Sequence, residues 1–511
     1  MSEGAILQLP SVREDVHDEA DVVVVGTGAG GAVVARVLVE RGLDVILVEE
    51  GPHVPVAEQR RDLYSALRLL WRDVGMQSAF GRSVIPVLQG RCVGGSTVVN
   101  AAIVHRLPTK IWDVWTREHG AGEGLRYEEL ERAWDVLERE LSVGPAPDDV
   151  LGENNRIFGE VARARGYAAE KIQRNVKDCA GSAGCNHGCR LGRKQSMNVT
   201  YVPRAVAGGA RVYATCRAER VVTRGGRAAG ISGRFVDPIT RRRGPRLSVG
   251  ARRAVVVAAS AIQTPLLLRA SGIGRRSGLV GERFQAHPGT AVVGVLDRPV
   301  DSWFGATQGY DSLQFWDERM KLETLSLPPE LLVARLPGLG SELMREVASA
   351  KHLVIWAVQV RARAHGRVRR SWFGPGASIR YDMLDEDVRL LKRGTTILAQ
   401  LMADAGARQI YPGIAGLPER VSSPDAFRAL EGMPDDPRLF HCIASHLFGT
   451  ATFGPDPARA VLKPSGEAHE LPGLWVADSS AFPTNLGVNP QHTICAWAWV
   501  LAERIAAQAG R

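Results

Sequence analysis

The segment Asp21–Gly31, DVVVVGTGAGG, decides the fold of this 511-residue chain. Its run of valines is typical of a strand buried on both faces of a parallel sheet. A helix of small residues is predicted from Ala29 to Arg41, and a second apolar strand runs from Asp44 to Val48 and ends at Glu49. Strand, glycine-rich turn, helix and second strand together make one complete βαβ unit.

The glycines of this unit fit a dinucleotide. Gly26 allows the tight turn, Gly28 lets a pyrophosphate approach the backbone, and Gly31 lets the helix pack against the strand. The helix N-terminus supplies N–H donors and a positive potential. Glu49 lies 18 residues beyond Gly31, where it is placed to accept hydrogen bonds from ribose hydroxyls. Because NAD and FAD share the half that this unit binds, the unit alone does not choose between them.

Composition excludes several classes of protein. With 45% hydrophobic and 23% charged residues the chain is typical of a soluble globular protein, and 64 Lys+Arg against 55 Asp+Glu give a net charge of +9. The densest arginine clusters, Arg241–Arg243 and Arg361–Arg370, lack interleaved aromatics, so we interpret them as solvated hairpin faces and predict no nucleic-acid partner. A targeting signal and an apolar run of about 18 residues are both missing, which predicts a cytoplasmic protein with no transmembrane segment.

A second glycine-rich segment, Gly90–Asn100 (GRCVGGSTVVN), is too small and polar to form a core strand. Such a loop lets the backbone pass close to a flat ligand. Farther along, an apolar strand from Ala254 to Ala258 leads into a helix from Ile262 to Ala270, and we expect this strand to join the nucleotide-binding sheet. A closing helix is predicted from about Pro490 to Ala507.

The sequence changes character between residues 300 and 440. Two strands, Lys351–Arg363 and Arg367–Phe373, flank Gly366 and are predicted to be long and antiparallel, and a helix is predicted from Glu386 to Ala405. This pattern is typical of an inserted α+β domain. We therefore expect an α/β protein with two interleaved domains. Their predicted segments are 15–110, 195–300 and 440–511 for the nucleotide-binding domain, and 111–194 and 301–439 for the substrate or cap domain.

Four blocks follow one another in order along the chain. They are the N-terminal GxGxxG unit, Gly90–Asn100, Ser260–Gly274 (SAIQTP continuing to SGIG), and His446 followed by Gly487–Pro490 (GVNP). In these blocks the chain resembles the glucose-methanol-choline (GMC) family of FAD-dependent oxidoreductases, and most of all its long-chain alcohol oxidase and cholesterol oxidase-like branch. The resemblance implies FAD, bound by a Rossmann-like domain that is interleaved with a substrate domain built on an antiparallel sheet.

The resemblance also implies where the cofactor lies. In the family, the loop that matches Gly90–Asn100 runs beside the isoalloxazine and the pyrophosphate. Members that attach FAD through a histidine carry it at the position of Val99, so noncovalent FAD is expected. Ala218 matches the strand whose backbone meets the adenine, and Asp478 matches an aspartate near the ribityl chain. The cofactor-binding residues expected from the βαβ unit and the resemblance are Gly26, Gly28, Gly31, Glu49, Gly90, Arg91, Val93, Gly94, Gly95, Ser96, Asn100, Ala218, Ala259, Asp478, Asn489 and Pro490.

Alcohol oxidation removes a proton from the hydroxyl and a hydride from the carbon, so the protein must supply a base. His446, in the sequence HLFGT, matches the active-site histidine of the family, and histidine suits this role because its ordinary pKa is about 6.5. Asn489 matches the family's second catalytic position, where an amide can hydrogen-bond the substrate oxygen. His287, which precedes Pro288, is interpreted as structural, and His492, in the first turn of the last helix, as a lesser pocket candidate.

The predicted reaction is oxidation of a primary or secondary alcohol to the carbonyl, with oxygen or another electron carrier as acceptor. Aromatic residues of the inserted domain suit a lipophilic or bulky alcohol. These candidate pocket residues are Trp303, Phe304, Phe315, Trp316 and Trp356. The alternative is a lyase of the hydroxynitrile type, which uses FAD structurally and would employ the same histidine.

Three cysteines form the pattern C-x5-C-x3-C at Cys179, Cys185 and Cys189. We favour a disulfide or a structural turn and predict no metal, because a fourth cysteine and the C-x2-C spacing of zinc sites are both missing nearby. Similar spacing holds a three-iron cluster in some FAD sugar dehydrogenases. An iron–sulfur cluster that passes electrons to a carrier therefore stays as a further alternative.

Overall fold

The computed structural model describes residues 6–60, 62–372, 374 and 376–509, arranged around two large sheets. The first sheet contains the βαβ unit, and its strand order is β1-β9-β3-β2-β12-β11-β10, with β21 paired to β12. Its strands are β1 (Ile6–Leu7), β2 (Val16–Val25), β3 (Val45–Val48), β9 (Arg211–Tyr213), β10 (Cys216–Arg224), β11 (Arg227–Val236), β12 (Arg243–Val257) and β21 (Leu474–Val476). Strands β1, β9, β3, β2, β12 and β21 pair in parallel, whereas β10, β11 and β12 pair antiparallel.

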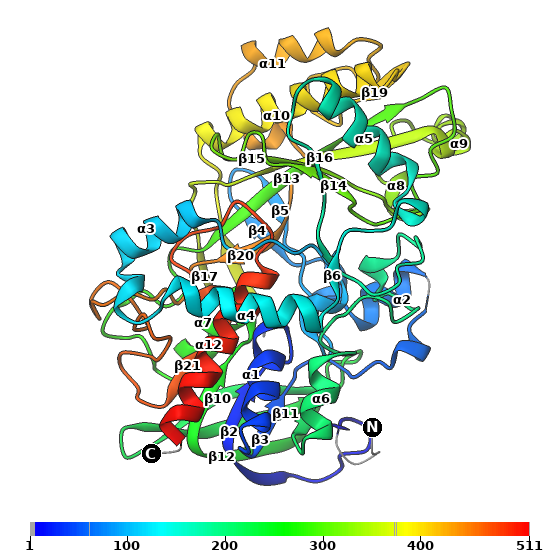
Figure 1. Ribbon diagram of the computed structural model, residues 1–511. Helices are drawn as coiled ribbons and strands as arrows, with labels where there is room; N and C mark the ends of the chain where they lie inside the picture. Colours follow the sequence, from blue (N-terminus) through cyan, green and yellow to red (C-terminus); the bar gives the residue numbers. More distant parts are fainter. Residues whose placement is uncertain (1–5, 61, 373, 375, 510–511) are drawn as a thin grey trace.

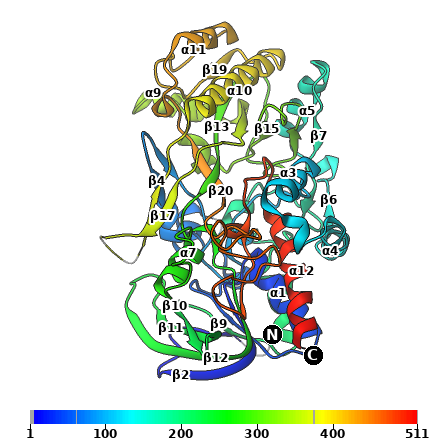
Figure 2. The same ribbon diagram turned by 90° about the vertical axis from the view of Figure 1, so that its left-hand side faces the viewer.

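The valine run forms the inner half of β2, as the sequence predicts. Val22, Val23 and Val24 are fully buried, because β3 and β12 flank the strand and helices cover one face of the sheet. These helices are α1 (Ala29–Glu40), α6 (Tyr201–Ala207) and α12 (Gln491–Ala509), with α4 (Tyr127–Glu140) packed across α12. Figure 2 shows α1 and α12 on one side and strands β10–β12 on the other. The predicted helices Ala29–Arg41 and Pro490–Ala507 are thus confirmed to within two residues at each end.

The second sheet is antiparallel throughout, in the order β19-β13-β16-β15-β14-β7 with β20 paired to β13. Its strands are β7 (Glu170–Lys171), β13 (Gln285–Val295), β14 (Tyr310–Ser312), β15 (Met320–Thr324), β16 (Leu353–Val360), β19 (Gln409–Tyr411) and β20 (Ile443–Phe448). The predicted helix Glu386–Ala405 is α10 (Asp385–Asp404), which packs on β16 and β13. Helix α5 (Glu153–Ala164) lies beside α10 and contacts β14. An antiparallel substrate-domain sheet above a Rossmann-type sheet confirms the predicted fold class (Figure 1).

One prediction for this region is wrong. The strands on either side of Gly366 do not pair with each other: β16 pairs with β13 and β15, whereas β17 (Arg367–Arg370) pairs with β18 (Ala377–Arg380). Gly366 forms a bridge with Phe284, and a Cβ at Gly366 would lie 2.2 Å from the carbonyl oxygen of Arg380. The chain therefore crosses from one sheet to another at this glycine, where only a residue without a side chain fits. Phe373, the predicted end of the second strand, lies outside the described residues.

The arginine clusters also differ from each other. Arg241–Arg243 is exposed at the turn between the antiparallel strands β11 and β12, as predicted. The second cluster is not one solvated face, because the guanidinium of Arg361 stacks on Trp316 with 4.6 Å between the guanidinium carbon and the ring centroid. Within the described part of the chain, the helices are too short or too polar to cross a membrane.

Smaller elements complete the fold. They are β4 (Ser78–Phe80) and β5 (Val84–Pro86) beside β18, the pair β6 (Val143–Gly144) and β8 (Arg174–Asn175), and helices α2 (Leu63–Leu69), α3 (Thr109–His119), α7 (Ser260–Ala270), α8 (Pro329–Val333), α9 (Ser341–Ala348) and α11 (Ala429–Gly432). The helix predicted from Ile262 to Ala270 is α7, and the strand predicted before it is the end of β12. Strands β13 and β20 belong to the antiparallel sheet, and the residue boundaries of the two domains stay a prediction.

Candidate active site

The glycine-rich turn after β2 has no room for side chains. Gly26 has φ +101°, and a Cβ there would lie 2.3 Å from the carbonyl oxygen of Ala258. A Cβ on Gly31 would lie 1.9 Å from the oxygen of Gly26, so the first turn of α1 rests directly on the strand. A Cβ on Gly28, in contrast, would meet only the Cα of Gly95, at 3.8 Å. The backbone at Gly28 is therefore open to a ligand at the positive end of α1.

Thr27 ties the two glycine-rich segments together. Its hydroxyl oxygen accepts a hydrogen bond from the amide of Gly94 (3.0 Å) and its hydroxyl donates to Glu49 (2.8 Å). The Glu49 carboxylate also accepts from the amides of Thr27 (3.1 Å) and Gly51 (2.8 Å), and burial raises the pKa of this acid. A carboxylate offers about four acceptor positions. Three are used within the chain, which leaves one for a ribose hydroxyl.

Arg91 supplies unpaired positive charge beside this turn. Its side chain is buried, and one guanidinium nitrogen donates to the carbonyl of Pro238 (2.8 Å), whereas Nε and Nη1 have no partner. Gly51 packs directly on the Arg91 backbone, because a Cβ there would lie 2.2 Å from the Arg91 carbonyl carbon. Buried donors without acceptors are costly. The open glycine turn and the free guanidinium nitrogens therefore fit an anionic dinucleotide such as FAD.

The Asp478 carboxylate is engaged by the protein itself. It accepts hydrogen bonds from the amides of Ser260 (2.9 Å) and Ser480 (2.8 Å) and from the hydroxyl of Thr264 (2.5 Å). These contacts join the start of α7 to the segment after β21, and Ala259 lies at the N-terminal end of α7. The predicted contact of Asp478 with a ribityl chain stays a prediction.

His446 and Asn489 come together from different elements. His446 lies on β20, Asn489 lies two residues before α12, and the Asn489 amide nitrogen is 3.2 Å from His446 Nε2. Burial, together with the charges of Lys321 and His105, lowers the pKa of His446 to about 3. The ring is therefore neutral near pH 7 and able to accept a proton. Two residues after Asn489, Gln491 at the start of α12 accepts a hydrogen bond from Asn100 in the second glycine-rich loop.

A buried lysine fixes the orientation of the Asn489 amide. Lys321 Nζ is 2.7 Å from Asn489 Oδ1 and forms ion pairs with Asp311 (3.1 Å) and Glu323 (3.0 Å). Burial alone would lower the pKa of Lys321, but the two carboxylates raise it, so the ammonium is charged. Since an ammonium only donates, the amide oxygen must face Lys321 and the amide N–H must face His446. Asp311 also contacts His105 Nε2 at 3.0 Å, which extends the network.

His287 approaches the other nitrogen of His446. Their Nδ1 atoms are 3.3 Å apart, with the two rings nearly perpendicular. Amide nitrogens approach both nitrogens of His287: the Gly487 amide donates to its Nε2 (3.0 Å), and Gln359 Nε2 is 3.2 Å from its Nδ1. Burial and the neighbouring His446 lower the pKa of His287 well below its usual value. Both rings are therefore neutral near pH 7, and His287 packs against the side of His446 that carries Nδ1.

The predicted aromatic residues divide into three groups. Trp316 lies at the site: a Cβ on Gly487, two residues before Asn489, would be 2.7 Å from its Nε1, which has no hydrogen-bond partner. Trp356 and Phe315 are buried in the core of the substrate domain, and Trp303 packs in a smaller core cluster beside it. Phe304 is 46% exposed. The pocket role is therefore best supported for Trp316.

Two other predictions have clear outcomes. The ring of His492 contacts Glu138 and Trp134 rather than His446. It is fully buried, its Nε2 is 3.1 Å from a carboxylate oxygen of Glu138, and it stacks on Trp134. All seven cysteines are free, so the disulfide alternative for Cys179, Cys185 and Cys189 is wrong. Among the described residues, His, Cys, Asp and Glu side chains do not gather in threes in a geometry that could hold a metal ion.

Sequence reasoning did not identify Lys321, Asp311 or His105, and it treated His287 as structural. Lys321 and Glu323 alternate with apolar residues on β15, a pattern that usually marks a solvent-facing side of a strand. Lys321 contacts Asn489, which lies 168 residues farther along the chain, so this contact depends on how distant segments pack.

A Rossmann-type nucleotide site next to a histidine–amide pair defines a class of proteins, the flavin-dependent oxidoreductases. Models of the N-terminal and C-terminal GMC oxidoreductase domains match residues 20–289 and 362–498. An uncharacterized GMC-type oxidoreductase of Mycobacterium tuberculosis is 36% identical over 96% of this chain and 76% of its own length. A long-chain-alcohol oxidase of Arabidopsis thaliana is 25% identical over 98% of this chain and 70% of its own.

Solved structures share the fold. Formate oxidase superposes with a TM-score of 0.75 at 16% identity, covering 98% of this chain and 100% of that one. Pyridoxine 4-oxidase gives a TM-score of 0.69 at 17% identity, with 95% and 98% covered. The chain belongs to the GMC oxidoreductase family, whose members are FAD-dependent enzymes, and the predicted family is thereby confirmed.

Proposed function

We propose that this enzyme oxidises a primary or secondary alcohol, lipophilic or bulky, to the carbonyl compound, with noncovalent FAD, His446 as base and Asn489 as the group that orients the substrate. The observation that carries the proposal is the fixed pair of a neutral histidine and an amide N–H, 3.2 Å apart. Together they offer one acceptor and one donor, which is what an alcohol hydroxyl requires. Val99 in place of a histidine supports noncovalent FAD.

A substrate hydroxyl would enter between the two side chains. Its O–H donates to His446 Nε2 and its oxygen accepts from the Asn489 amide, which Lys321 holds in the required orientation. As His446 takes the hydroxyl proton, the amide stabilises the negative charge that develops on the oxygen. FAD, when bound, supplies the acceptor for the hydride that leaves the carbinol carbon. Trp316 contributes apolar surface beside this position, which favours a bulky or lipophilic alcohol.

The cofactor would be held by the open turn at Gly28, by the remaining acceptor position of Glu49 and by the free guanidinium nitrogens of Arg91. The loop Gly90–Asn100 runs between this turn and the start of α12, so it joins the nucleotide end of the site to the catalytic end. The contacts of the remaining cofactor residues, among them Ala218, Ala259, Asp478 and Pro490, belong to the same proposal.

Two relatives are named as oxidases. The Arabidopsis protein is named a long-chain-alcohol oxidase, which supports a lipophilic alcohol, and a Streptomyces fradiae protein that is 26% identical over 95% of this chain is named paromamine 6'-oxidase. The test is an anaerobic screen of long-chain alcohols, sterols and sugars against the FAD-loaded enzyme. Bleaching of the flavin absorbance by an alcohol supports the proposal. Cleavage of a hydroxynitrile while the flavin stays oxidised, with no alcohol bleaching it, would favour the lyase and contradict the proposal. Admission of air then shows whether oxygen is the acceptor.

A further inference from the structure

Two buried cations near the end of the second glycine-rich loop have no carboxylate partner among the described residues. Arg174, on β8, and Lys194 are each only 1% exposed. Lys194 Nζ donates to the carbonyls of Val98 (2.7 Å), Asn100 (2.8 Å) and Cys185 (2.8 Å), and Arg174 donates to the carbonyl of Ala101. Among the described residues, the ion pairs of this region include neither cation; the carboxylate of Asp178 pairs instead with Arg193. Buried charges without a counter-charge are strongly destabilising.

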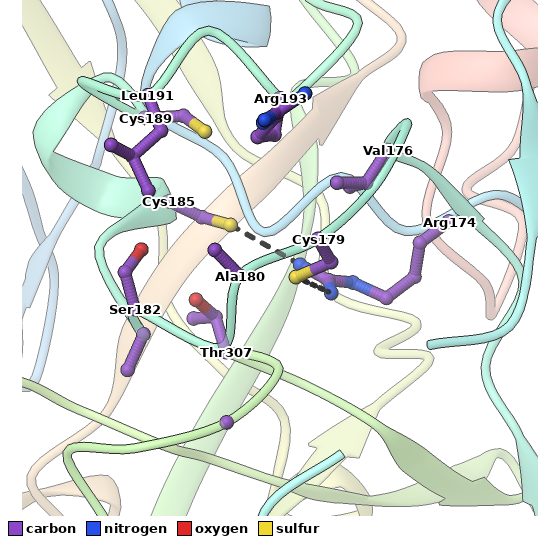
Figure 3. Close-up of a pocket in the computed structure, with 12 residues that line it drawn as sticks. Arg174, Val176, Cys179, Ala180, Ser182, Cys185, Cys189, Leu191, Arg193 and Thr307 are labelled. Carbon is purple, nitrogen blue, oxygen red and sulfur yellow. Dashed lines mark hydrogen bonds between the residues drawn. The ribbon is translucent and has the colours of Figure 1, made fainter. Parts of the chain in front are cut away.

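Sulfur atoms occupy the place of the missing carboxylate. The guanidinium of Arg174 lies 3.1 Å from Cys185 Sγ and 3.9 Å from Cys179 Sγ, and both contacts are visible in Figure 3. Cys189 Sγ accepts a hydrogen bond from the amide of Lys194 at 3.2 Å. A single thiolate at Cys185 would therefore lie against Arg174 and next to Lys194, where it provides the counter-charge that both cations lack.

The surroundings of Cys185 support the charged form. Burial raises the pKa of this thiol, but the charges of Arg174 and Lys194 outweigh it, so the pKa is lowered overall. The pKa of Cys189 is raised, by burial and by the charge of Cys185. Cys495 is an internal contrast in the same chain, because it is buried without a cation on its sulfur and burial raises its pKa to about 12.

A recess leads to this cluster. Cys179, Cys185, Cys189, Arg174 and Thr307 are among the residues that line it, and its atom-free space is about 290 Å³, including the part open to solvent. Figure 3 shows the sulfur of Cys185 directed toward the guanidinium within this recess. Of the two cysteines that contact Arg174, Cys179 is partly exposed and Cys185 is buried. The space at the sulfurs has room for about one molecule of the size of water or hydrogen peroxide, and not for a macromolecule.

We propose that Cys185 is a thiolate paired with Arg174, and that it is the residue of this chain that a small peroxide modifies. The thiolate sulfur attacks one oxygen of hydrogen peroxide, the O–O bond breaks, and the departing hydroxide takes a proton from solvent to form water. The sulfur is oxidised by two electrons to a sulfenic acid and the peroxide is reduced. Cys179, on the same guanidinium, is the thiol placed to condense with this product. The proposal does not depend on the proposed alcohol oxidation.

Modification at Cys185 also affects the cofactor loop. A sulfenic acid is neutral, so it removes the counter-charge of Arg174 and Lys194, and those cations hold the carbonyls of Val98, Asn100 and Ala101. Oxidised enzyme should therefore release FAD faster than reduced enzyme. Free-flavin fluorescence measures this release without any turnover.

The first test is limited alkylation of the purified holoenzyme with iodoacetamide near pH 7, followed by peptide mass spectrometry. If exposure alone governed reactivity, Cys179 would react first. The proposal predicts that Cys185 reacts at least about tenfold faster than Cys179 and that Cys495 stays unmodified, because the thiolate is the nucleophile. With hydrogen peroxide and dimedone, the product is a dimedone adduct on Cys185 or a disulfide between Cys185 and Cys179.

A variant gives the second test. Arg174→Gln should slow alkylation of Cys185 by about tenfold or more, and Arg174→Lys, which keeps the charge, should retain most of the rate. If Arg174→Gln does not fold, the comparison of cysteines within the wild-type chain still decides the question. Faster labelling of Cys179 than of Cys185 would overturn the proposal. So would purified enzyme that contains bound iron and in which Cys185 is protected from both reagents.

Discussion

The rate of flavin reduction should stay nearly constant as the pH falls from 8 to about 5. The reason is that burial, with the charges of Lys321 and His105, holds the pKa of His446 at about 3. A histidine with a lowered pKa keeps its neutral, proton-accepting form until the pH approaches that lower value. Loss of the base by protonation should therefore begin far below the usual range for histidine.

The size of the effect follows from the two pKa values. A base with an ordinary pKa of about 6.5 would be only about 3% neutral at pH 5, a loss of about thirtyfold in rate. With a pKa of about 3 for His446, about 99% of the ring is neutral at that pH. The two cases differ by more than an order of magnitude at a pH that most proteins tolerate.

The assay is anaerobic stopped-flow reduction of the FAD-loaded enzyme by a saturating and by a limiting alcohol concentration between pH 5 and 8. The rates at limiting concentration report the free enzyme. Lys321→Met is a useful comparison, because removal of the cation should raise the pKa of His446 and move the acidic limb upward. A wild-type profile that falls tenfold per pH unit below about 6.5 would refute the reasoning.

Three further predictions concern the residues around the catalytic pair. Lys321→Met removes the ammonium from two buried carboxylates, so it should lower the free energy of unfolding by about 3 kcal/mol or more, measured by denaturant titration; an equally stable variant would contradict the network. Gly487→Ala forces a Cβ into a position 2.7 Å from Trp316 Nε1 and into φ +70°, so reduction should slow by at least about tenfold while FAD content stays normal. Glu49→Ala leaves the amide and hydroxyl of Thr27 without their acceptor, so FAD should bind more weakly by about 1–3 kcal/mol in an equilibrium titration; unchanged affinity would exclude this role.

The nucleotide-binding part of the fold was predictable because its signals are local. Continuous valines require a strand buried on both faces, and the glycines at 26 and 31 stand where a Cβ would meet backbone oxygen. The ends of α1 and α10 differ from the predicted ends by at most one residue. The pairing of the strands around Gly366 was not predictable, since it is set by where the chain turns between two sheets.

The catalytic pair was predicted from a sequence motif, but its surroundings were not. His287 lies beside His446 because β13 pairs with β20, and the register shifts between Ala286 and Pro288, where a bulge redirects the side chain. Lys321 reaches Asn489 across the packing of two distant segments. Such contacts depend on tertiary structure, so neither the composition nor the spacing of residues in the sequence predicts them. The cysteine spacing likewise could not show that the sulfurs are free and that Arg174 lies among them.

The most direct test of the catalytic account is single-turnover reduction of FAD by a substrate alcohol in His446→Gln, compared with wild type at equal FAD loading. Glutamine keeps a polar side chain of similar length but cannot accept the hydroxyl proton as a base. The account predicts that the variant binds FAD normally and reduces it about 10²–10⁴-fold more slowly, the usual contribution of a positioned base. Reduction at the wild-type rate by the FAD-loaded variant would contradict the assignment of His446 as the base.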